Sequence, residues 1–404
     1  MVERQGRVLN LGSHTRLFTV GFFVRIGQWT IPVRTLTGKV PRVGCDGVEK
    51  LPLILTPISA IAVDSSLITV QEVFARTDHG DNRILKSENN HIIITGANGF
   101  LGSHLTNALV SAGTKVTQLV RLKDSSSNKE GSQIELDLTD RKRVAEIFSA
   151  LQPDYVIHLA GIKNRNDAGA QFRDSYDANL SISLNVIEAC LRFNQLKRFV
   201  FLGSCDEYGR IAEPFDEMQR EIPVNSYGLS KLAVTKILFG LYQSCQFPSV
   251  VLRPTIIYGP SQGDEMFLSA LIQSLLVQKD FAMTYGEQYR DFVYVDDVVD
   301  AIIKVLTATD CVNGVVINVG AGVSCQVKKI ANLIADLIHI DVYKHLKFGV
   351  VSYRPNETMD YAVNIRRAET LLGWQPTTKL ERGLQQTINH FKAQVNPPKT
   401  AIDD

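Results

Sequence analysis

The chain has 404 residues, which is enough for one large domain or for two or three of ordinary size. Hydrophobic residues make up 45% and charged residues 21%, so the composition excludes a disordered chain, a collagen-like fibre and a polytopic membrane protein. The formal net charge is +1, from 43 Lys and Arg against 42 Asp and Glu. No overall basic field therefore indicates binding to nucleic acid.

The six cysteines are scattered, and no pair has the Cys-x-x-Cys spacing. This pattern predicts neither a disulfide framework nor a metal site, and it favours a reducing, cytoplasmic location. The longest apolar stretches near the start are Leu17–Val24 and Leu51–Val63, and both are shorter than the roughly 18 residues of a spanning helix. The sequence therefore predicts a protein without a membrane span.

Residues 1–90 show poor periodicity and no motif. Short strand-prone runs such as Leu67–Phe74 are separated by Gly, Pro and Ser, and the polar stretch Asp78–Asn90 is typical of a linker. Three interpretations of this extension of uncertain structure remain: a small extra domain, a loosely packed extension, or a mis-called start of translation.

Beginning at His91, short strands alternate with helical segments. The predicted strands are His91–Thr95, Lys115–Val120, Tyr155–Leu159, Arg198–Leu202 and Ser249–Leu252, and the predicted helices are Ser103–Ala112, Arg141–Leu151, Phe172–Asn194 and Tyr227–Ser244. Some strands are apolar almost throughout, which is typical of a parallel sheet covered on both faces. The expected fold class is α/β: a Rossmann-type doubly wound parallel sheet over residues 91–252, interleaved with a smaller mixed α/β, substrate-binding lobe over 253–393, and a tail over 394–404.

A glycine-rich run, residues 95–102, lies directly between the first of these strands and the helix that follows. Glycines there allow a tight turn and let the backbone approach a pyrophosphate, which rests on the partial positive charge of the helix N-terminus. The run predicts a dinucleotide site, and its Gly-x-x-Gly-x-x-Gly spacing resembles the short-chain dehydrogenase/reductase superfamily. Its predicted cofactor contacts are Gly96, Asn98, Gly99, Phe100, Leu101 and Gly102.

An acidic residue about 20 positions after this loop would hold the ribose 2′-hydroxyl of NAD. The second strand instead ends in Arg121, and a planar, bidentate guanidinium suits the 2′-phosphate of NADP. NADP is therefore the preferred cofactor and NAD the alternative, in which Arg121 is solvated and Asp124 or a backbone group binds the ribose. Asp137 and Leu138 end the next strand, where the superfamily places an adenine contact.

Tyr227 and Lys231 are four residues apart in a predicted helix, so both side chains lie on one face. The reference pKa of tyrosine is near 10, and a shift of about three units is needed for tyrosine to act as a base near pH 7. A nearby lysine ammonium and the positive nicotinamide ring both shift the pKa in that direction. The spacing alone occurs by chance in many helices, and it gains weight from the glycine loop that precedes it.

Over about residues 91–393 the chain resembles an extended short-chain dehydrogenase/reductase of the nucleotide-sugar epimerase/dehydratase family. The matching motifs are Thr95–Gly102, His158–Gly161, Ser204 with Tyr208-Gly209, Tyr227 with Lys231, Arg253-Pro254 with Tyr258–Pro260, Gly286–Asp297, Asn318–Gly320 and Leu372–Trp374. So many motifs in this order are highly specific for the family and much less specific for the substrate.

The resemblance implies roles for individual residues. Ser204 would hydrogen-bond the reacting sugar oxygen, Tyr227 would move the proton and Lys231 would hold the nicotinamide ribose. Arg290 and Arg354 match arginines that clamp the diphosphate of a nucleotide-linked sugar, a bidentate role that suits guanidinium groups. The implied set also contains Leu159, Ala160 and Gly161 at the cofactor and Asp206 at the substrate, while the pair Asp296-Asp297 is structural.

The chemistry of this family is hydride transfer at C4 of the sugar. Its dehydratases carry a Thr-Asp-Glu run that begins four residues before the Tyr-Gly, and these positions here hold Ser204, Cys205 and Asp206. Cys205 cannot replace an aspartic acid proton donor, and Glu207, on a strand-like segment, would face the other way. A dehydratase is therefore not expected.

Three functions remain. A 4-epimerase shares the general motif set. A reductase of 4-keto-6-deoxy sugars fits the missing NAD-type acid and the segment Phe348–Glu357, which looks like that of enzymes making abequose- or paratose-type sugars. Ile256 and Asn364 stand where many members carry Asn and Asp, so the sugar stays open. A non-catalytic NADP-binding module is the third alternative, although such members often lack the tyrosine or lysine that are present here.

The predicted helices Phe172–Asn194 and Tyr227–Ser244 carry more apolar residues than one buried stripe requires. Leu180, Leu184, Ile187 and Leu191 lie on the first, and Leu232, Ile237, Leu238 and Leu241 on the second. Extended family members pair these helices, so the resemblance implies a homodimer. The alternative is that these side chains belong to the core.

Overall fold

The computed structural model describes residues 2–11, 15–26, 29–40, 90–121, 131–163, 171–354 and 357–395. The chain divides into two compact units, Met1–Leu67 and Ile68–Asp404. In the first unit, β1 (Val2–Leu11), β2 (Thr15–Ile26) and β3 (Trp29–Val40) form an antiparallel sheet in that order. The run Leu67–Phe74 and the linker up to residue 89 lie outside the described residues, and the domain boundary at residue 90 stays a prediction.

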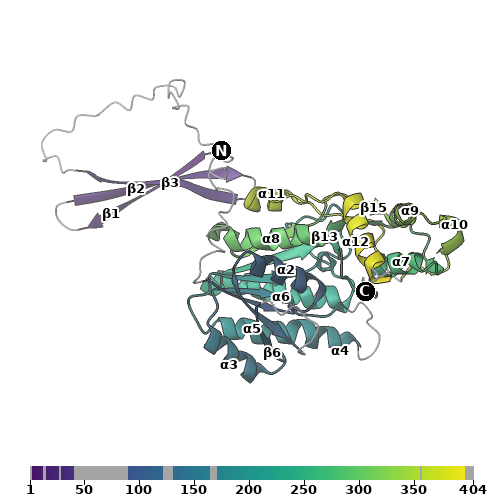
Figure 1. Cartoon of the computed structure of the whole chain (residues 1–404). Helices are drawn as coiled ribbons and strands as arrows, with labels where there is room; N and C mark the ends of the chain where they lie inside the picture. Colours follow the sequence, from purple (N-terminus) through teal and green to yellow (C-terminus); the bar gives the residue numbers. More distant parts are fainter. Residues whose placement is uncertain are drawn as a thin grey trace, which may run out of the picture. The chain divides into compact units, whose positions relative to one another are not determined.

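A seven-stranded parallel sheet forms the centre of the second unit (Figure 1). In spatial order its strands are β14 (Val315–Val319), β9 (Ser249–Pro254), β8 (Arg198–Leu202), β7 (Tyr155–His158), β4 (His91–Thr95), β5 (Lys115–Val120) and β6 (Ser132–Glu135). The expected doubly wound sheet is confirmed, because the strand order reverses direction at β4. All five predicted strands are present, with the end of β7 one residue earlier and the end of β9 two residues later than expected.

Successive side chains of the central strands enter two separate cores. In β4, Ile92 and Ile94 pack on one face of the sheet and Ile93 on the other, and none of the three is exposed. In β9, Val250 and Val251 divide between the faces in the same way. A strand that is buried on both faces needs apolar residues at both alternating positions, which explains the nearly continuous apolar runs.

Helices cover both faces of the sheet (Figure 1). One face carries α2 (Phe100–Ser111) and α8 (Val295–Thr307), and the other carries α3 (Arg141–Leu151), α5 (Ile182–Cys190) and α6 (Ser226–Cys245). The long helix expected over about Phe172–Asn194 is present from Gln171 to Cys190, and it contains a π-helical turn. It runs through α4 (Gln171–Tyr176), the π-helical turn η1 (Asp177–Ser181) and α5, and within η1 the side chain of Asn179 bonds the backbone of Ile162, outside the helix.

The smaller lobe has mixed α/β structure, as expected. Its strands pair as β10 (Ile256–Tyr258) with β13 (Phe292–Tyr294), β11 (Phe281–Met283) with β16 (Leu346–Phe348), and β12 (Tyr289–Arg290) with β15 (Cys325–Gln326). Its helices are α7 (Phe267–Leu276), α9 (Val327–Ile338), α10 (Val342–His345), α11 (Arg366–Leu372) and α12 (Leu380–Val395). The chain returns from this lobe to supply β14 to the large sheet, so the two parts are interleaved.

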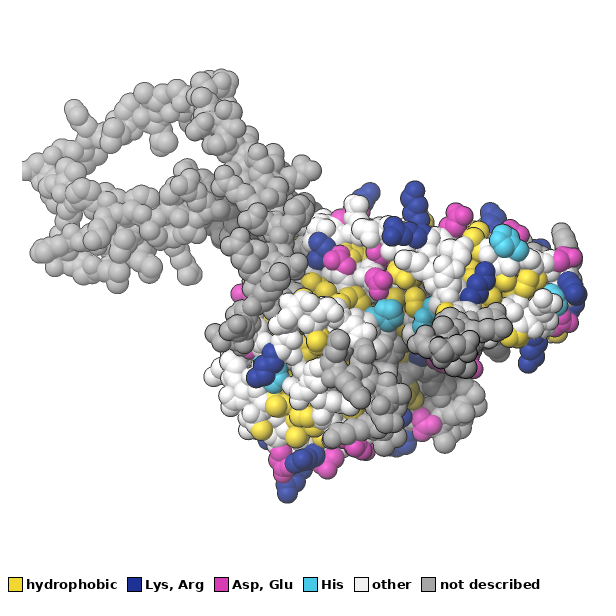
Figure 2. Space-filling model, in the orientation of Figure 1, with side chains coloured by type: hydrophobic (Ala, Val, Ile, Leu, Met, Phe, Trp, Pro, Cys, Tyr) yellow, Lys and Arg dark blue, Asp and Glu magenta, His cyan; other side chains and the backbone are white. Residues whose placement is uncertain are grey.

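The surface agrees with the balanced charge of the sequence. On the face drawn in Figure 2, dark-blue and magenta side chains of the described residues are interspersed, without a field of one sign. Within the described residues, the helices are all too short or too polar to cross a membrane. The cytoplasmic location that the cysteine pattern favours stays a prediction.

Asp297, in the first turn of α8, ties the sheet to the C-terminal segment. Its carboxylate accepts hydrogen bonds from the Thr377 amide and hydroxyl, both at 2.9 Å, and from the Thr378 amide at 3.2 Å. Its backbone carbonyl accepts from the fully buried indole of Trp374 at 3.0 Å. The neighbouring Asp296 has a side chain that is 63% exposed. Asp297 therefore has a structural task that Asp296 does not share.

Replacing Asp297 by Ala is expected to lower the free energy of unfolding by about 1–3 kcal/mol, because several donors lose a buried acceptor. Asp296→Ala is the matched control, and its exposed contact with His104 is worth less than about 1 kcal/mol. Urea unfolding followed by circular dichroism measures both values. Equal destabilisation by the two changes would contradict the anchoring role of Asp297.

Candidate functional site

The glycine loop after β4 forms a tight cradle at the carboxyl end of the sheet. Gly96 has a φ of +69°, and a Cβ there would lie 2.8 Å from the backbone nitrogen of Ala160. A Cβ at Gly102 would collide with the carbonyl oxygen of Gly96. The amide of Gly99 closes the turn on that same carbonyl at 3.1 Å, and α2 begins at Phe100. Only glycine fits these places, and the loop delivers a helix N-terminus suited to a pyrophosphate.

The other predicted residues of this loop differ in exposure. Asn98 is exposed and Phe100 is half-buried, and the Phe100 ring lies edge-on to that of His104 at 5.5 Å. The side chain of Leu101 belongs to the core and is 7% exposed. Asn98 can therefore meet a ligand through its side chain, whereas Leu101 can do so only through its backbone amide.

The predicted adenosine-end residues lie beyond β5 and β6. Arg121 is exposed immediately after β5. The carboxylate of Asp137 accepts hydrogen bonds from the Thr139 amide at 2.9 Å and hydroxyl at 2.8 Å, and Leu138 is buried. These hydrogen bonds lower the pKa of Asp137, and the guanidinium of Arg121 lowers it further. Arg121 and Asp137 therefore lie close enough at the edge of the sheet for the positive charge of one to stabilise the negative charge of the other.

The predicted cofactor segment after β7 lies between the glycine loop and α6. The amides of Leu159 and Ala160 donate to the carbonyl and hydroxyl of Thr95 at 3.2 and 3.3 Å. A Cβ at Gly161 would lie 3.4 Å from Nζ of Lys231. The fold therefore brings the glycine loop and Lys231 to one edge of the sheet, although they are far apart in the sequence.

The π-helical turn η1 contributes Asn179, a residue that the sequence analysis did not select. Its amide nitrogen donates to the carbonyl of Ile162 at 3.2 Å and to the hydroxyl of Ser230 at 3.0 Å. Its carbonyl oxygen accepts from the Ile162 amide at 2.9 Å. Asn179 thus joins the segment after β7 to α6. The available signal was an Asn inside a predicted helix, where this residue type is disfavoured, and that signal is weak on its own.

Helix α6 presents the Tyr-Lys pair at its first two turns. Asn225 caps the helix by accepting from the Gly228 amide at 2.8 Å. Tyr227 is 8% exposed and Lys231 is 4% exposed. Both side chains belong to the face of α6 that packs against the sheet, as the four-residue spacing predicts.

Lys231 is held where the carboxyl end of β8 meets α6. Its Nζ donates to the carbonyl of Leu202 at 2.9 Å and lies 4.9 Å from the ring centre of Phe201. Burial lowers the pKa of Lys231 to about 8, and the carboxylate of Glu207 opposes this shift. The side chain is therefore mostly an ammonium at neutral pH and loses its proton in the mildly alkaline range.

Ser204 follows β8 and caps a 3₁₀ turn, η2 (Cys205–Glu207). Its hydroxyl accepts from the Asp206 amide at 3.1 Å, so its proton is left to be donated elsewhere. A Cβ at Gly228 would lie 2.5 Å from the carbonyl oxygen of Asp206, so η2 packs tightly against the first turn of α6. The structure therefore brings the elements that carry Ser204 and Tyr227 together, and Asp206 is buried between them.

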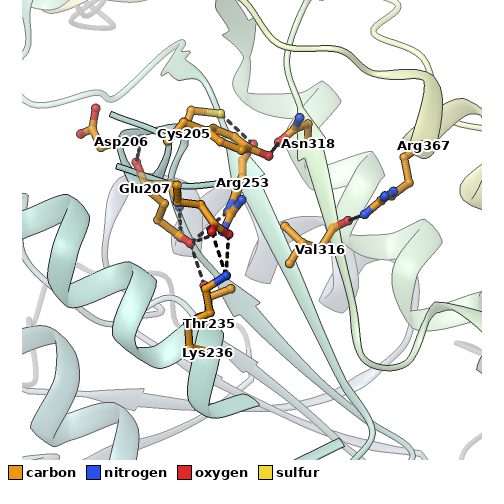
Figure 3. A network of polar contacts seen from close by, with 12 residues as sticks. Cys205, Asp206, Glu207, Thr235, Lys236, Arg253, Val316, Asn318 and Arg367 are labelled. Carbon is orange, nitrogen blue, oxygen red and sulfur yellow. Dashed lines mark hydrogen bonds and ion pairs between the residues drawn. The ribbon is translucent and has the colours of Figure 1, made fainter. Parts of the chain in front are cut away.

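The strand-like segment expected at Glu207 is instead the 3₁₀ turn η2. Because η2 curls the chain, the fully buried carboxylate of Glu207 turns inward and meets Arg253 at 2.8 Å (Figure 3). The guanidinium of Arg253 also pairs with Glu221 at 2.9 Å and lies 4.5 Å from the ring centre of Tyr208. Lys236 closes this network on Glu221 at 2.8 Å.

The two predicted diphosphate arginines lie at one turn of the smaller lobe. Arg290, on β12, is ion-paired with Glu357 and lies 5.9 Å from the ring centre of Tyr361. Arg354 is exposed, and its carbonyl accepts from the Glu357 amide at 3.1 Å. Glu357 thus links both arginines, and an incoming anion would compete with its carboxylate for Arg290. Among the described residues, no group of three or more His, Cys, Asp and Glu could hold a metal ion.

Comparison with known proteins agrees with this arrangement. A Bacillus subtilis (strain 168) protein described as an uncharacterized UDP-glucose epimerase is 29% identical, over 75% of this chain and 98% of its own length. The dTDP-D-glucose 4,6-dehydratase of Mus musculus is 26% identical, over 77% of this chain and 91% of its own. The structure of the UDP-glucuronic acid 4-epimerase of Bacillus cereus, in complex with UDP-glucuronic acid and NAD, superposes with a TM-score of 0.69 at 26% identity, covering 75% of this chain and 99% of that one.

The family model described as NAD dependent epimerase/dehydratase family matches residues 92–320, which is more than half of the chain. The matched range contains the glycine loop, Ser204 and the Tyr-Lys pair. The chain belongs to the NAD dependent epimerase/dehydratase family.

Proposed function

We propose that the chain is a nucleotide-sugar 4-epimerase, which oxidises C4 of a nucleotide-linked sugar and reduces it again from the opposite face. The observation that carries this proposal is the convergence of Ser204, Tyr227 and Lys231 on the sheet edge that holds the glycine cradle. A bound nicotinamide dinucleotide would accept the hydride and return it. The loop fits such a ligand, because glycines at 96 and 102 permit the tight turn that leads into the N-terminus of α2, where a pyrophosphate is favoured.

Each residue then has one task. Tyr227 takes the proton of the sugar 4-hydroxyl and later returns it, and the nearby Lys231 ammonium stabilises the phenolate that does so. The Ser204 hydroxyl accepts from a backbone amide and so can donate its own proton to the reacting sugar oxygen. Arg290 and Arg354 bind the diphosphate, and Asp206 lies next to the sugar.

The environment of Cys205 supports an epimerase over a dehydratase. Its side chain is fully buried and donates to the carbonyl of Arg253 at 3.2 Å. Burial raises the pKa of the Cys205 thiol well above its usual value. The thiol is therefore buried in the protein and remains protonated, and the carboxylate of Glu207 is ion-paired with Arg253. Neither residue supplies the acid that water elimination requires.

A second function, reduction of a nucleotide-linked 4-keto-6-deoxy sugar, is favoured by one observation. Arg121 occupies the end of β5, where an NAD-specific site carries a carboxylate, and its side chain is exposed. NADPH is the usual hydride donor of a reductase. The epimerase and the reductase share Ser204, Tyr227 and Lys231, and they differ in whether the cofactor leaves oxidised.

Purified protein should interconvert a nucleotide-linked sugar and its C4 epimer without net change in nicotinamide absorbance, in a panel that includes UDP-glucose, UDP-glucuronic acid and dTDP-glucose. Tyr227→Phe should lower kcat by about 10²–10⁴-fold, because it removes the proton carrier. NMR of the products and the absorbance of the cofactor measure both effects.

Stoichiometric NADPH oxidation with a 4-keto-6-deoxy sugar would instead establish the reductase. A Tyr227→Phe protein that keeps its full biological function would establish a non-catalytic binding module.

We infer a preference for NADP over NAD from Arg121. Replacing Arg121 by Ser should weaken NADPH binding by about tenfold or more and leave NADH binding nearly unchanged, because only NADPH offers the guanidinium a phosphate. Arg143→Ser, at another exposed arginine of this domain, is the control. Nicotinamide fluorescence titration gives both dissociation constants, and equal effects on the two cofactors would rule this preference out.

We also propose a homodimer formed through α5 and α6. On these helices Leu184, Leu229 and Phe239 are 41%, 43% and 52% exposed, whereas Ile187 and Leu238 belong to the core. Light scattering at micromolar concentration should give twice the chain mass, and Leu184→Lys with Phe239→Lys should give the monomer. Met218→Lys, which changes an exposed apolar residue outside these helices, should remain dimeric. A monomeric wild-type protein would refute the proposal.

A further inference from the structure

One carboxylate in the buried network contacts three elements of the site at once. Oε1 of Glu207 accepts from the backbone amide of Ser204 at 2.9 Å. Its Oε2 accepts from the Thr235 hydroxyl at 2.8 Å and from Nε of Arg253 at 2.9 Å (Figure 3). Ser204 is the N-cap of η2 after β8, Thr235 lies on α6 and Arg253 lies on β9. Glu207 is fully buried, so water does not compete for these bonds.

We propose that Glu207 is a positioning residue of the reaction: its carboxylate fixes Ser204 relative to α6, the helix that carries Tyr227 and Lys231. Thr235 lies one turn after Lys231 on the same helix, so the bond to Thr235 joins the two halves of the site. This inference rests on the proposed function for the roles of Ser204 and Lys231.

A purely structural task, the neutralisation of Arg253, does not account for these contacts. Arg253 is fully buried and needs a partner anion, because an unpaired buried charge is strongly destabilising. Glu221 also provides one, at 2.9 Å from the guanidinium. Among the contacts that the structure records, Glu221 reaches Arg253 and Lys236, whereas Glu207 reaches Ser204 and Thr235 as well. Both carboxylates therefore neutralise Arg253, but in these contacts it is Glu207 that also bonds Ser204 and Thr235.

The charge balance around Lys231 gives Glu207 its second task. Burial lowers the pKa of Lys231 to about 8, and the carboxylate of Glu207 opposes this. On the side of β7, His158 is neutral, since burial lowers its pKa to about 3. Tyr227 precedes Lys231 by one turn on α6, and Asp206 is next to Glu207 on η2. Arg253 on β9 pairs with Glu207 and with Glu221. Removing the charge of Glu207 therefore lowers the pKa of Lys231 further.

The test compares Glu207→Gln with Glu221→Gln, which removes the other carboxylate from Arg253. The affinity for NADPH and NADH is measured by nicotinamide fluorescence between about pH 6 and 10, because the ammonium of Lys231 is proposed to bind the nicotinamide ribose. In the wild-type protein the cofactor affinity should fall as the pH rises and Lys231 loses its proton, with a midpoint near the pKa of Lys231, about 8. Glu207→Gln should lower this midpoint by about half a pH unit or more, and Glu221→Gln should leave it in place.

A second variant separates the effect of the Glu207 hydrogen bond to α6 from the effect of the Glu207 charge. Thr235→Val keeps the carboxylate but breaks its bond to α6, so it should lower kcat while leaving the pH midpoint and the KM of the nucleotide sugar unchanged. Thermal unfolding establishes that each variant is folded, and if Glu207→Gln is not, Thr235→Val carries the test alone. An unchanged kcat in Thr235→Val, or equal midpoints in Glu207→Gln and Glu221→Gln, would overturn the proposal.

The same measurements distinguish this inference from the proposed function. Cofactor affinity requires no sugar, so a shifted midpoint in a protein that converts none of the panel would support the link between Glu207 and Lys231 while refuting the epimerase. Turnover of a nucleotide sugar with identical pH midpoints in all proteins would support the epimerase and overturn the role of Glu207.

Discussion

Burial of the parallel sheet on both faces is the constraint on which the rest of this structure depends. Parallel strands must be joined by crossovers, and the helices in those crossovers cover the apolar faces. Every strand then ends at the same edge, and the segments after β4, β7, β8 and β9 meet there. The glycine loop, Ser204 and Arg253 come from different parts of the sequence and meet at this edge for this reason. The site is a consequence of the topology, as in other open α/β sheets.

Three arginines show how the surroundings of a guanidinium decide whether it stabilises the fold or can bind a ligand. Arg253 has no exposure and two carboxylate partners, so its charge is used inside the protein. Arg121 is exposed at the end of a strand and acts on Asp137 from a distance. Arg290 is intermediate, since it pairs with Glu357, which an anion could displace. Residue type predicts a guanidinium in each case, but burial decides which of them can bind a ligand.

The chemistry proposed for this site uses buried groups whose protonation is set by competition between burial and nearby charge. Lys231 has little exposure and would lose its proton more readily without an anion nearby. His158 shows the other outcome, because burial lowers its pKa to about 3 and leaves it neutral, bonded to Thr95 at 2.7 Å and Ser183 at 2.9 Å. A lysine that stays charged and a histidine that stays neutral can therefore lie on the same sheet edge.

The sequence by itself determined the parallel sheet, the positions of five of its seven strands to within two residues, the glycine loop and the helical spacing of Tyr227 and Lys231. These features depend on local periodicity and on spacing within one element, both of which are written in consecutive residues. Only the tertiary structure decided the inward turn of Glu207, the π-helical turn at Asn179 and the pairing of Arg290 with Glu357. Each of these joins residues from separate elements, so its energy depends on contacts that no local pattern records. The direction of Glu207 also changes with the backbone, because a 3₁₀ turn and a strand point the same residue to different sides.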